Sequence, residues 1–233
     1  MRQVFLDTET TGLYANQGDR IIEIGCVELV NRKLTGNNLH FYVNPGRDSH
    51  EEALKVHGIT TDFLRDKPPF ATIVGDLLNY LKDAEVIIHN AVFDLGFLDV
   101  ELSLVKRDSL RSHVTSIVDT LVMAKAMFPG KRNSLDALCD RLGVDNSGRT
   151  LHGALLDAEL LADVYINLTR GQDALIMDAG GDPAVAHTRV KTDLTRLALP
   201  VVVASALELA AHEEVLLQID KSSSGKTLWR TTL

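Results

Sequence analysis

The chain has 233 residues, of which 45% are hydrophobic, so it can bury a core and still carry an appendage. Its formal net charge of −8 argues against a protein that coats duplex DNA nonspecifically, because such proteins are basic. The charge does not exclude an enzyme that acts on nucleic acid, because metal ions can bridge an acidic site to phosphate.

The sequence also indicates where the protein works. It contains no run of about 18 apolar residues, so we expect no transmembrane helix and no membrane partner. The apolar N-terminus runs directly into an acidic pair, which leaves no room for a signal peptide. Cys26 and Cys139 lie far apart in apolar contexts without a CxxC partner, which is typical of reduced core thiols. We therefore expect a cytoplasmic protein.

Hydrophobic patterning predicts strands first and then alternating strands and helices. The expected strands span residues 4–6, 20–30, 34–43, 85–89 and 116–118. The expected helices span residues 71–81, 94–105, 120–128, 134–142 and 155–168. Short polar turns separate the first three strands, so these strands can pair antiparallel. This order is typical of an α/β fold in which helices flank one mixed central sheet.

The composition changes after the last of these helices. Residues 171–200 contain a glycine pair and two prolines, which is typical of a linker, and a helical pattern resumes over residues 201–219. We therefore predict three parts, namely a folded domain over residues 1–170, a linker over 171–200 and a helical tail over 201–233.

Two acids end the first predicted strand. A strand alternates its side chains with a period of two, so Asp7 and Glu9 project to the same side. Two like charges side by side repel each other unless a cation lies between them. We interpret this pair as metal ligands.

Two further aspartates lie on apolar helix faces. Asp94 shares its face with Leu98, and Asp157 shares its face with Leu161 and Val164, so both carboxylates point toward the core. Each aspartate also fits a simpler role, in which it caps the start of a helix. That alternative suits Asp157 less well, because the helical pattern can begin before it.

His152 adds an imidazole to these acids. It precedes Asp157 in the stretch HGALLDA, where Gly153 lets the chain bend and bring both side chains to one site. Four carboxylates carry a charge of about −4, which two divalent ions neutralise, and oxygen ligands without cysteine favour Mg²⁺ or Mn²⁺ over structural zinc. Two such ions can clamp a phosphodiester. The imidazole is suited to take the proton of the attacking water near neutral pH.

Three motifs, DTETTG at 7–12, HNAVFD at 89–94 and HGALLDA at 152–158, resemble the exonuclease motifs of the DEDDh 3′–5′ exonuclease family. That resemblance covers roughly residues 1–170. The stretches RIIEIGCVEL, NSLDALCDRLGV and TLWR are similar, more narrowly, to the family of proofreading epsilon subunits of bacterial DNA polymerase III. The resemblance implies a ribonuclease H-like fold, two Mg²⁺ or Mn²⁺ ions, and removal of mispaired nucleotides from a DNA 3′ end as 5′-monophosphates.

The resemblance also implies roles for individual residues. It makes Asp7, Glu9, Asp94 and Asp157 the metal ligands and His152 the general base. It places at the substrate the residues Asp7, Glu9, Thr10, Gly12, Leu13, His57, Phe93 and Asp157.

Other interpretations of two positions stay open. His57 is equally typical of a helix end, since Gly58 follows it, and Phe93 is equally typical of a core residue. We interpret Asp119 as the N-cap of the helix at 120–128 rather than as a fifth metal ligand.

Partners are implied as well. They are a single-stranded or frayed DNA 3′ end, the polymerase III alpha subunit bound by residues 201–233, and, as an open option, a small theta-like subunit. The hexapeptide QDALIM resembles the Gln-x-x-aliphatic motif with which replication proteins bind the sliding clamp (beta), through Gln172, Leu175 and Met177. Met177 stands where that motif has an aromatic residue, and a chance match is the alternative.

Two other functions fit the same motifs. A stand-alone 3′–5′ RNA exonuclease of the same superfamily shares the four acids and the histidine, and the C-terminal extension argues against it. A catalytically silent replicase scaffold subunit would lack a motif residue, and all five are present.

Overall fold

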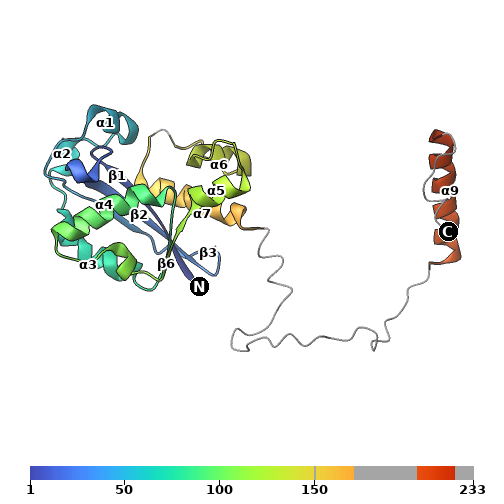
Figure 1. Cartoon of the computed structure of the whole chain (residues 1–233), viewed down its shortest axis with the longest axis horizontal. Coiled ribbons are helices and arrows are strands. Elements are labelled where there is room, and N and C mark those ends of the chain that lie inside the picture. The colour runs from blue at the N-terminus through green and yellow to red at the C-terminus, as the bar shows by residue number, and fades with distance from the viewer. Residues whose placement is uncertain (150, 171–203, 224–233) are drawn as a thin grey trace. The chain divides into compact units, whose positions relative to one another are not determined.

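The structure, a computed structural model, describes residues 1–149, 151–170 and 204–223. It divides the chain into two units, Met1–Gly180 and Gly181–Leu233. The first unit is an α/β domain, and the described part of the second is helix α9 (Ala206–Ser222), both drawn in Figure 1. None of the helices in the described ranges is long and apolar enough to cross a membrane.

A six-stranded mixed sheet forms the centre of the first unit. Its strands are β1 (Arg2–Thr10), β2 (Ile21–Val30), β3 (Lys33–Leu34), β4 (Leu39–Tyr42), β5 (Glu85–Ile88) and β6 (Ser116–Asp119). Their order is β3-β2-β1-β5-β6, and β4 pairs with β2. Strand β1 is antiparallel to β2 and parallel to β5, which is parallel to β6. The predicted mixed sheet is confirmed.

Helices flank this sheet. They are α1 (Glu51–His57), α2 (Thr61–Leu64), α3 (Phe70–Leu81), α4 (Ala91–Leu104), α5 (Thr120–Met127), α6 (Leu135–Leu142) and α7 (Ala154–Leu168). Two short 3₁₀ turns, η1 (Ala15–Gln17) and η2 (Leu110–Ser112), lie in the connections.

The alternation of β1 divides the core between the two faces of the sheet. Val4 and Leu6 pack with buried residues of α3 and α4, whereas Phe5 packs with Ala158 and Leu161 of α7. Helix α7 therefore covers the face opposite α3 and α4, as Figure 1 shows. This burial fixes the register of β1, because a slip of one residue would exchange the two faces.

Gly25 lets α7 approach the sheet closely. In the register of β1 and β2 it lies opposite Asp7. A Cβ atom at position 25 would overlap backbone atoms of Ala154 and Leu155, at the start of α7. The missing side chain at position 25 therefore sets the position of the helix that carries Asp157.

The predicted single strand at 34–43 is wrong. The chain forms two separate strands there, β3 and β4, and both pair with β2. Gly36 has a φ of 77°, in the left-handed region, so the extended backbone is interrupted between the two strands.

Helix α4 begins three residues earlier than the predicted 94–105. Its N-cap residue Asn90 has a φ of 66°, and the Asp119 carboxylate accepts the backbone N–H groups of Asn90 at 3.3 Å and Ala91 at 3.1 Å. A residue distant in sequence thus satisfies the helix start, which no local pattern indicates. Helices α1 and α2 have no counterpart among the predicted elements.

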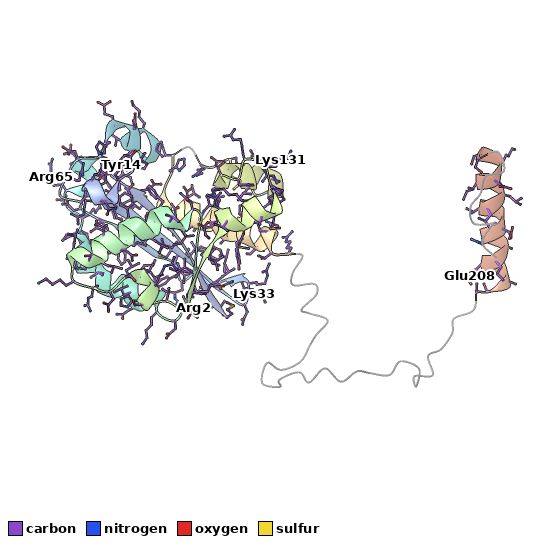
Figure 2. The ribbon with its side chains drawn as sticks, viewed as in Figure 1. Arg2, Tyr14, Lys33, Arg65, Lys131 and Glu208 are labelled. Carbon is purple, nitrogen blue, oxygen red and sulfur yellow. The ribbon has the colours of Figure 1, made fainter. Side chains whose placement is uncertain are left out.

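Two other predictions are confirmed. Cys26 and Cys139 are both buried and free. The helix expected in the tail is present as α9. Ser205 and Glu208 form a capping box at its start, and Glu208 is labelled in Figure 2.

Candidate active site

The acids singled out in the sequence lie around one cavity. Asp7 and Glu9 are on β1, Asp94 is in the first turn of α4, and Asp157 is in the first turn of α7. All four line a cavity of about 550 Å³, together with His152. The chain therefore brings together the five residues that the sequence predicted for metal binding and catalysis.

Thr8 orients one of these acids. Its hydroxyl donates a 2.7 Å hydrogen bond to Oδ1 of Asp94, and both side chains are buried. Thr8 also lines the cavity. Sequence analysis did not single out this threonine, although its place between Asp7 and Glu9 puts it on the same strand.

Glu23 holds the start of α7. Its Oε2 accepts the backbone N–H of Ala154 at 3.1 Å, and its Oε1 lies 2.7 Å from Nε2 of His40. The residue is only 2% exposed and pairs with Glu9 across the β1–β2 ladder. Glu23 therefore links the strand that carries Glu9 to the helix that carries Asp157. Sequence analysis missed it, because the contact spans 131 residues.

The cavity is rich in negative charge. Burial raises the pKa of Asp7 well above its ordinary value, and the charges of Asp94, Asp157 and Glu9 raise it further. Burial, followed by the charge of Asp157, raises the pKa of Glu9 to about 8. Burial likewise raises the pKa of Asp94 to about 7, against the hydrogen bond from Thr8. Burial is the largest cause of each shift, and neighbouring carboxylates add to it.

The site fits divalent cations. Ligand atoms of Glu9, His152 and Asp157 lie within 4.8 Å of one another. Carboxylate oxygens with one imidazole suit Mg²⁺ or Mn²⁺, and a divalent ion would place positive charge among these acids. These residues could therefore hold the metal of a hydrolytic site.

One basic residue enters the acid cluster. Arg149 donates from Nε and Nη2 to the two oxygens of Asp157, each at 2.6 Å. Its Nη2 also lies 2.7 Å from Nδ1 of His152, and its Nη1 donates to Asp136. Burial lowers the pKa of Arg149, but the two aspartates outweigh this effect and raise it. Sequence analysis did not single out this arginine.

The turn after β1 borders a second cavity. Gly12 and Leu13 line a neighbouring cavity of about 530 Å³, and Leu13 is 65% exposed. The Thr10 hydroxyl donates to the carbonyl of Gly12 at 2.6 Å, which closes the turn. A Cβ atom at position 12 would overlap Asp19 and His50, so the turn requires glycine.

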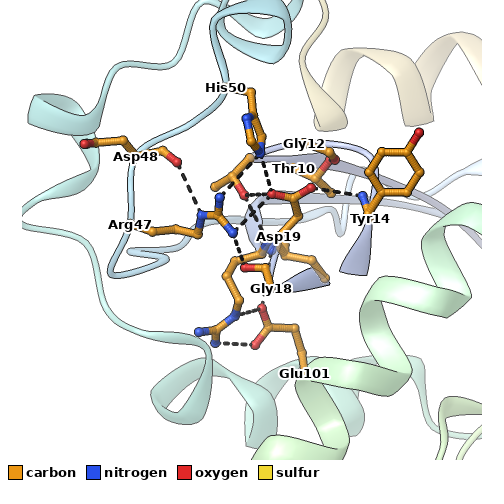
Figure 3. A network of polar contacts seen from close by, with 12 residues as sticks. Thr10, Gly12, Tyr14, Gly18, Asp19, Arg47, Asp48, His50 and Glu101 are labelled. Carbon is orange, nitrogen blue, oxygen red and sulfur yellow. Dashed lines mark hydrogen bonds and ion pairs between the residues drawn. The ribbon is translucent and has the colours of Figure 1, made fainter. Parts of the chain in front are cut away.

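Polar contacts hold this turn in place, as Figure 3 shows. Asp19 is 3% exposed, accepts the backbone N–H of Tyr14 at 3.0 Å, and lies 3.0 Å from Nε2 of His50. Arg47 pairs with the same carboxylate at 3.2 Å and donates to the carbonyl of Gly18. These contacts tie Asp19 to both sides of the turn that carries Gly12 and Leu13.

The remaining predicted contacts have different surroundings. His57 ends α1, is 4% exposed and accepts the backbone N–H of Ile59 on Nδ1, while Nε2 has no hydrogen-bond partner among the residues that the structure describes. Neither His57 nor Thr10 lines the two cavities. Phe93 packs against Phe97 with ring centroids 5.0 Å apart and also lines the acid-lined cavity.

Asp119 and the clamp-like residues complete the comparison with the sequence. Asp119 accepts the backbone N–H of Leu121 at 2.8 Å at the start of α5, so its interpretation as an N-cap is confirmed. The clamp-like residues Gln172, Leu175 and Met177 lie outside the described residues.

Comparisons with known proteins identify the family. The Exonuclease family profile matches residues 4–165. DNA polymerase III subunit epsilon of Escherichia coli (strain K12) is 48% identical over 237 residues, covering 98% of this chain and 97% of that protein. Its counterpart in Pasteurella multocida is 47% identical over 241 residues, covering 100% and 94%.

Solved structures agree with this assignment. Exonuclease X in complex with 5′ overhanging duplex DNA matches with a TM-score of 0.56 and 26% identity, covering 73% of this chain and 93% of that one. Exonuclease I without ligand matches with a TM-score of 0.62, covering 76% and 44%, and at 20% identity it shows the fold alone. The chain belongs to the Exonuclease family and, within it, to the epsilon subunits of DNA polymerase III.

Proposed function

We propose that this exonuclease removes mispaired nucleotides from the 3′ end of DNA as 5′-monophosphates, as the proofreading subunit of a DNA polymerase III core in the cytoplasm. The observation that carries the proposal is the single cavity shared by Asp7, Glu9, Asp94, Asp157 and His152. Family membership adds the polymerase, because the relatives that match nearly the whole chain are subunits of DNA polymerase III.

The four acids are assigned to two divalent cations, Mg²⁺ or Mn²⁺. When bound, such ions neutralise phosphate charge, lower the pKa of water and stabilise the leaving oxygen. Ligand atoms of Glu9, Asp157 and His152 lie within 4.8 Å of one another. Thr8 and Glu23 keep Asp94 and α7 in place, so the ligand set is held before an ion arrives.

His152 is assigned the role of general base. Its ring is 44% exposed at the cavity, and Nδ1 lies 3.4 Å from Oδ2 of Asp157. That aspartate stabilises the imidazolium formed when the ring takes the proton of the attacking water. Nη2 of Arg149 can only donate and lies 2.7 Å from Nδ1, so Nε2 carries the ring proton while that contact lasts. We therefore assign Nε2 to the water only when that contact is broken and Nδ1–H is directed at Asp157. The backbone N–H of His152 donates to Val56 at 3.1 Å, which ties the loop to α1.

The turn after β1 is assigned to the terminal nucleotide. Leu13 presents an exposed apolar side chain on a segment fixed by Thr10 and Gly12, so it can pack against the last base. Phe93 borders the acids and can contact the sugar or base of the same nucleotide. The buried Nε2 of His57 can donate to the substrate if the end of α1 opens toward it.

We assign a role in the same function to each of the three parts of the chain. We assign residues 1–170 to the nuclease, 171–200 to a linker with the clamp-binding motif, and 201–233 to the polymerase alpha subunit. Apolar side chains exposed on α9 support the last assignment, because they need a partner to leave water; they are Leu207 at 83%, Leu209 at 55% and Leu217 at 58% exposed. A small theta-like subunit can join the same core.

Deletion of residues 201–233 tests this assignment. The truncated chain should no longer co-purify with the alpha subunit, yet it should keep its nuclease activity. Unchanged co-purification would refute the tail as the binding segment.

The activity itself is tested on a 5′-labelled single-stranded DNA oligonucleotide and the matching RNA, each with Mg²⁺. Wild type should give a 3′-to-5′ ladder that is stronger on DNA. Asp7→Asn should abolish the ladder, because it removes a charged ligand at constant size. Asp140→Asn, at an exposed position on α6, is the matched control and should leave the ladder intact.

The other outcomes decide between the alternatives. A stronger ladder on RNA would identify a stand-alone RNA exonuclease of the superfamily. No metal-dependent ladder on either substrate would identify a catalytically silent scaffold subunit.

A further inference from the structure

Arg149 occupies a position that a metal-binding site does not normally give to a cation. Its side chain is 7% exposed, and it forms a two-pronged pair with both oxygens of Asp157, each at 2.6 Å. The same guanidinium lies 2.7 Å from Nδ1 of His152. Ligand atoms of Glu9, His152 and Asp157 lie within 4.8 Å of one another, and Arg149 contacts the last two of these residues.

A divalent ion and this guanidinium compete for the same oxygens. The planar guanidinium fits a carboxylate with two parallel hydrogen bonds, which engages both oxygens of Asp157 at once. An ion bound to Asp157 would lie beside a second cation, and like charges repel strongly where water is scarce. Simultaneous binding of Asp157 to the divalent ion and to the Arg149 guanidinium is therefore unfavourable.

We propose that Arg149 is a displaceable counter-cation, which neutralises Asp157 in the metal-free protein and leaves that carboxylate when a divalent ion binds. This inference rests on the metal-dependent nuclease proposed above. It gives the buried Asp157 a partner at a stage when it would otherwise be an unpaired buried charge. It also lowers the apparent affinity of the site for metal, because each binding event must break this pair.

The surroundings of Arg149 permit such an exchange. The residue lies in the connection between α6 and α7, outside any helix or strand, so its backbone is not held by a ladder. Its Nη1 already contacts Asp136, which is 55% exposed at the rim of the cavity. Asp136 can keep the guanidinium at the rim after it has left Asp157.

Calorimetric titration of the full chain with Mn²⁺, after removal of metal with a chelator, tests the proposal. Arg149→Gln removes the charge and keeps a polar side chain. It should bind Mn²⁺ at least about tenfold more tightly than wild type, since a hydrogen-bonded charge pair no longer has to break. Arg65→Gln is the matched control, because it removes one positive charge at a 72% exposed position that pairs with Asp62. It should bind Mn²⁺ as wild type does.

Thermal unfolding supplies a second measurement. Without metal, Arg149→Gln should unfold at a lower temperature than wild type, because Asp157 is left buried without its partner. Added Mn²⁺ should raise its unfolding temperature by more than it raises that of wild type. Arg149→Lys keeps the charge but loses the two-pronged geometry, so it should bind Mn²⁺ with intermediate affinity. It takes over the titration if the glutamine variant does not fold.

The outcomes separate this inference from the proposed function. In one outcome, wild type binds Mn²⁺ while the folded Arg149 variants bind it equally well or more weakly. That result would overturn the proposal that Arg149 is a displaceable counter-cation, and it would leave the proposed function standing. A wild-type chain that binds no Mn²⁺ would overturn the metal site and the inference with it.

Discussion

Replacing Gly25 by alanine should damage the catalytic site from outside the cavity. The added Cβ would overlap backbone atoms of Ala154 and Leu155, which cannot rotate away as a side chain can. Relief of the overlap requires β2 and α7 to separate by roughly an ångström, since carbon atoms pack at about 3.5–4.0 Å. That movement carries Asp157 and His152 away from Asp7, which lies opposite Gly25 on β1.

Two magnitudes follow for Gly25→Ala. Overpacking of a core contact costs about 1–3 kcal/mol of unfolding free energy, which lowers the unfolding temperature by roughly 2–12 °C for a domain of this size. A misplacement of about 1 Å in a catalytic group costs about 100-fold in rate. Chemical denaturation and the DNA ladder assay, both in Mg²⁺, measure the two effects.

The matched control is Gly75→Ala. Gly75 lies on the exposed face of α3, and a Cβ there meets nothing within 4 Å. Alanine at that position should leave activity unchanged and stabilise the helix by about 0.5–1 kcal/mol. Wild-type stability and rate in Gly25→Ala would refute the reasoning. A lower stability with a full rate would show that the contact supports the fold but does not position the site.

Three further predictions concern the rim, the turn and the acid cluster. Lys131 lines the acid-lined cavity, so Lys131→Gln should reduce the slope of log affinity for single-stranded DNA against log salt by about 0.7, and an unchanged slope would exclude a phosphate contact. Burial raises the pKa of Asp19, but hydrogen bonds from its neighbours outweigh this effect, so the net pKa lies below the ordinary 3.8. Its stabilisation is therefore present above pH 3.8 and lost as the pH falls through the lower folded-state pKa. Denaturation curves should show Asp19→Asn less stable than wild type at pH 7, with a gap that narrows in acid; a gap independent of pH would contradict this. Thr8→Val should raise the Mg²⁺ concentration needed for half-maximal activity, because Asp94 loses a hydrogen bond worth about 1.5–3 kcal/mol, and Thr8→Ser should restore it.

Local patterns in the sequence account for the parts of the fold that were predicted. The period of two along β1 places Val4 and Leu6 on one face and Phe5 on the other, and the structure has this arrangement. The same period predicted that Asp7 and Glu9 share a side, and both line the cavity. Helix faces and caps, which depend on residues three or four apart, were predicted for the same reason.

Most of the residues that were missed act over long distances in the chain. Glu23 contacts the start of α7 across 131 residues, and Asp119 caps the start of α4 from the end of β6. The overlap that makes glycine necessary at position 25 comes from α7, so nothing near Gly25 in the sequence reveals it. The pairing of Arg149 with Asp157 spans only eight residues. It crosses a loop, and a loop lacks the regular side-chain repeat from which helix and strand contacts can be predicted. Tertiary contacts alone determine these features.

The contact of β1 with α7 also sets when the nuclease becomes active during synthesis. Asp7 and Glu9 on β1 leave the ribosome before Asp157, which belongs to α7, much later in the chain. A nascent chain that lacks α7 holds its acids without their partners, and it leaves Phe5 without the apolar cover of Ala158 and Leu161. We therefore expect the nuclease to gain its activity only after α7 has been synthesised and packed against β1.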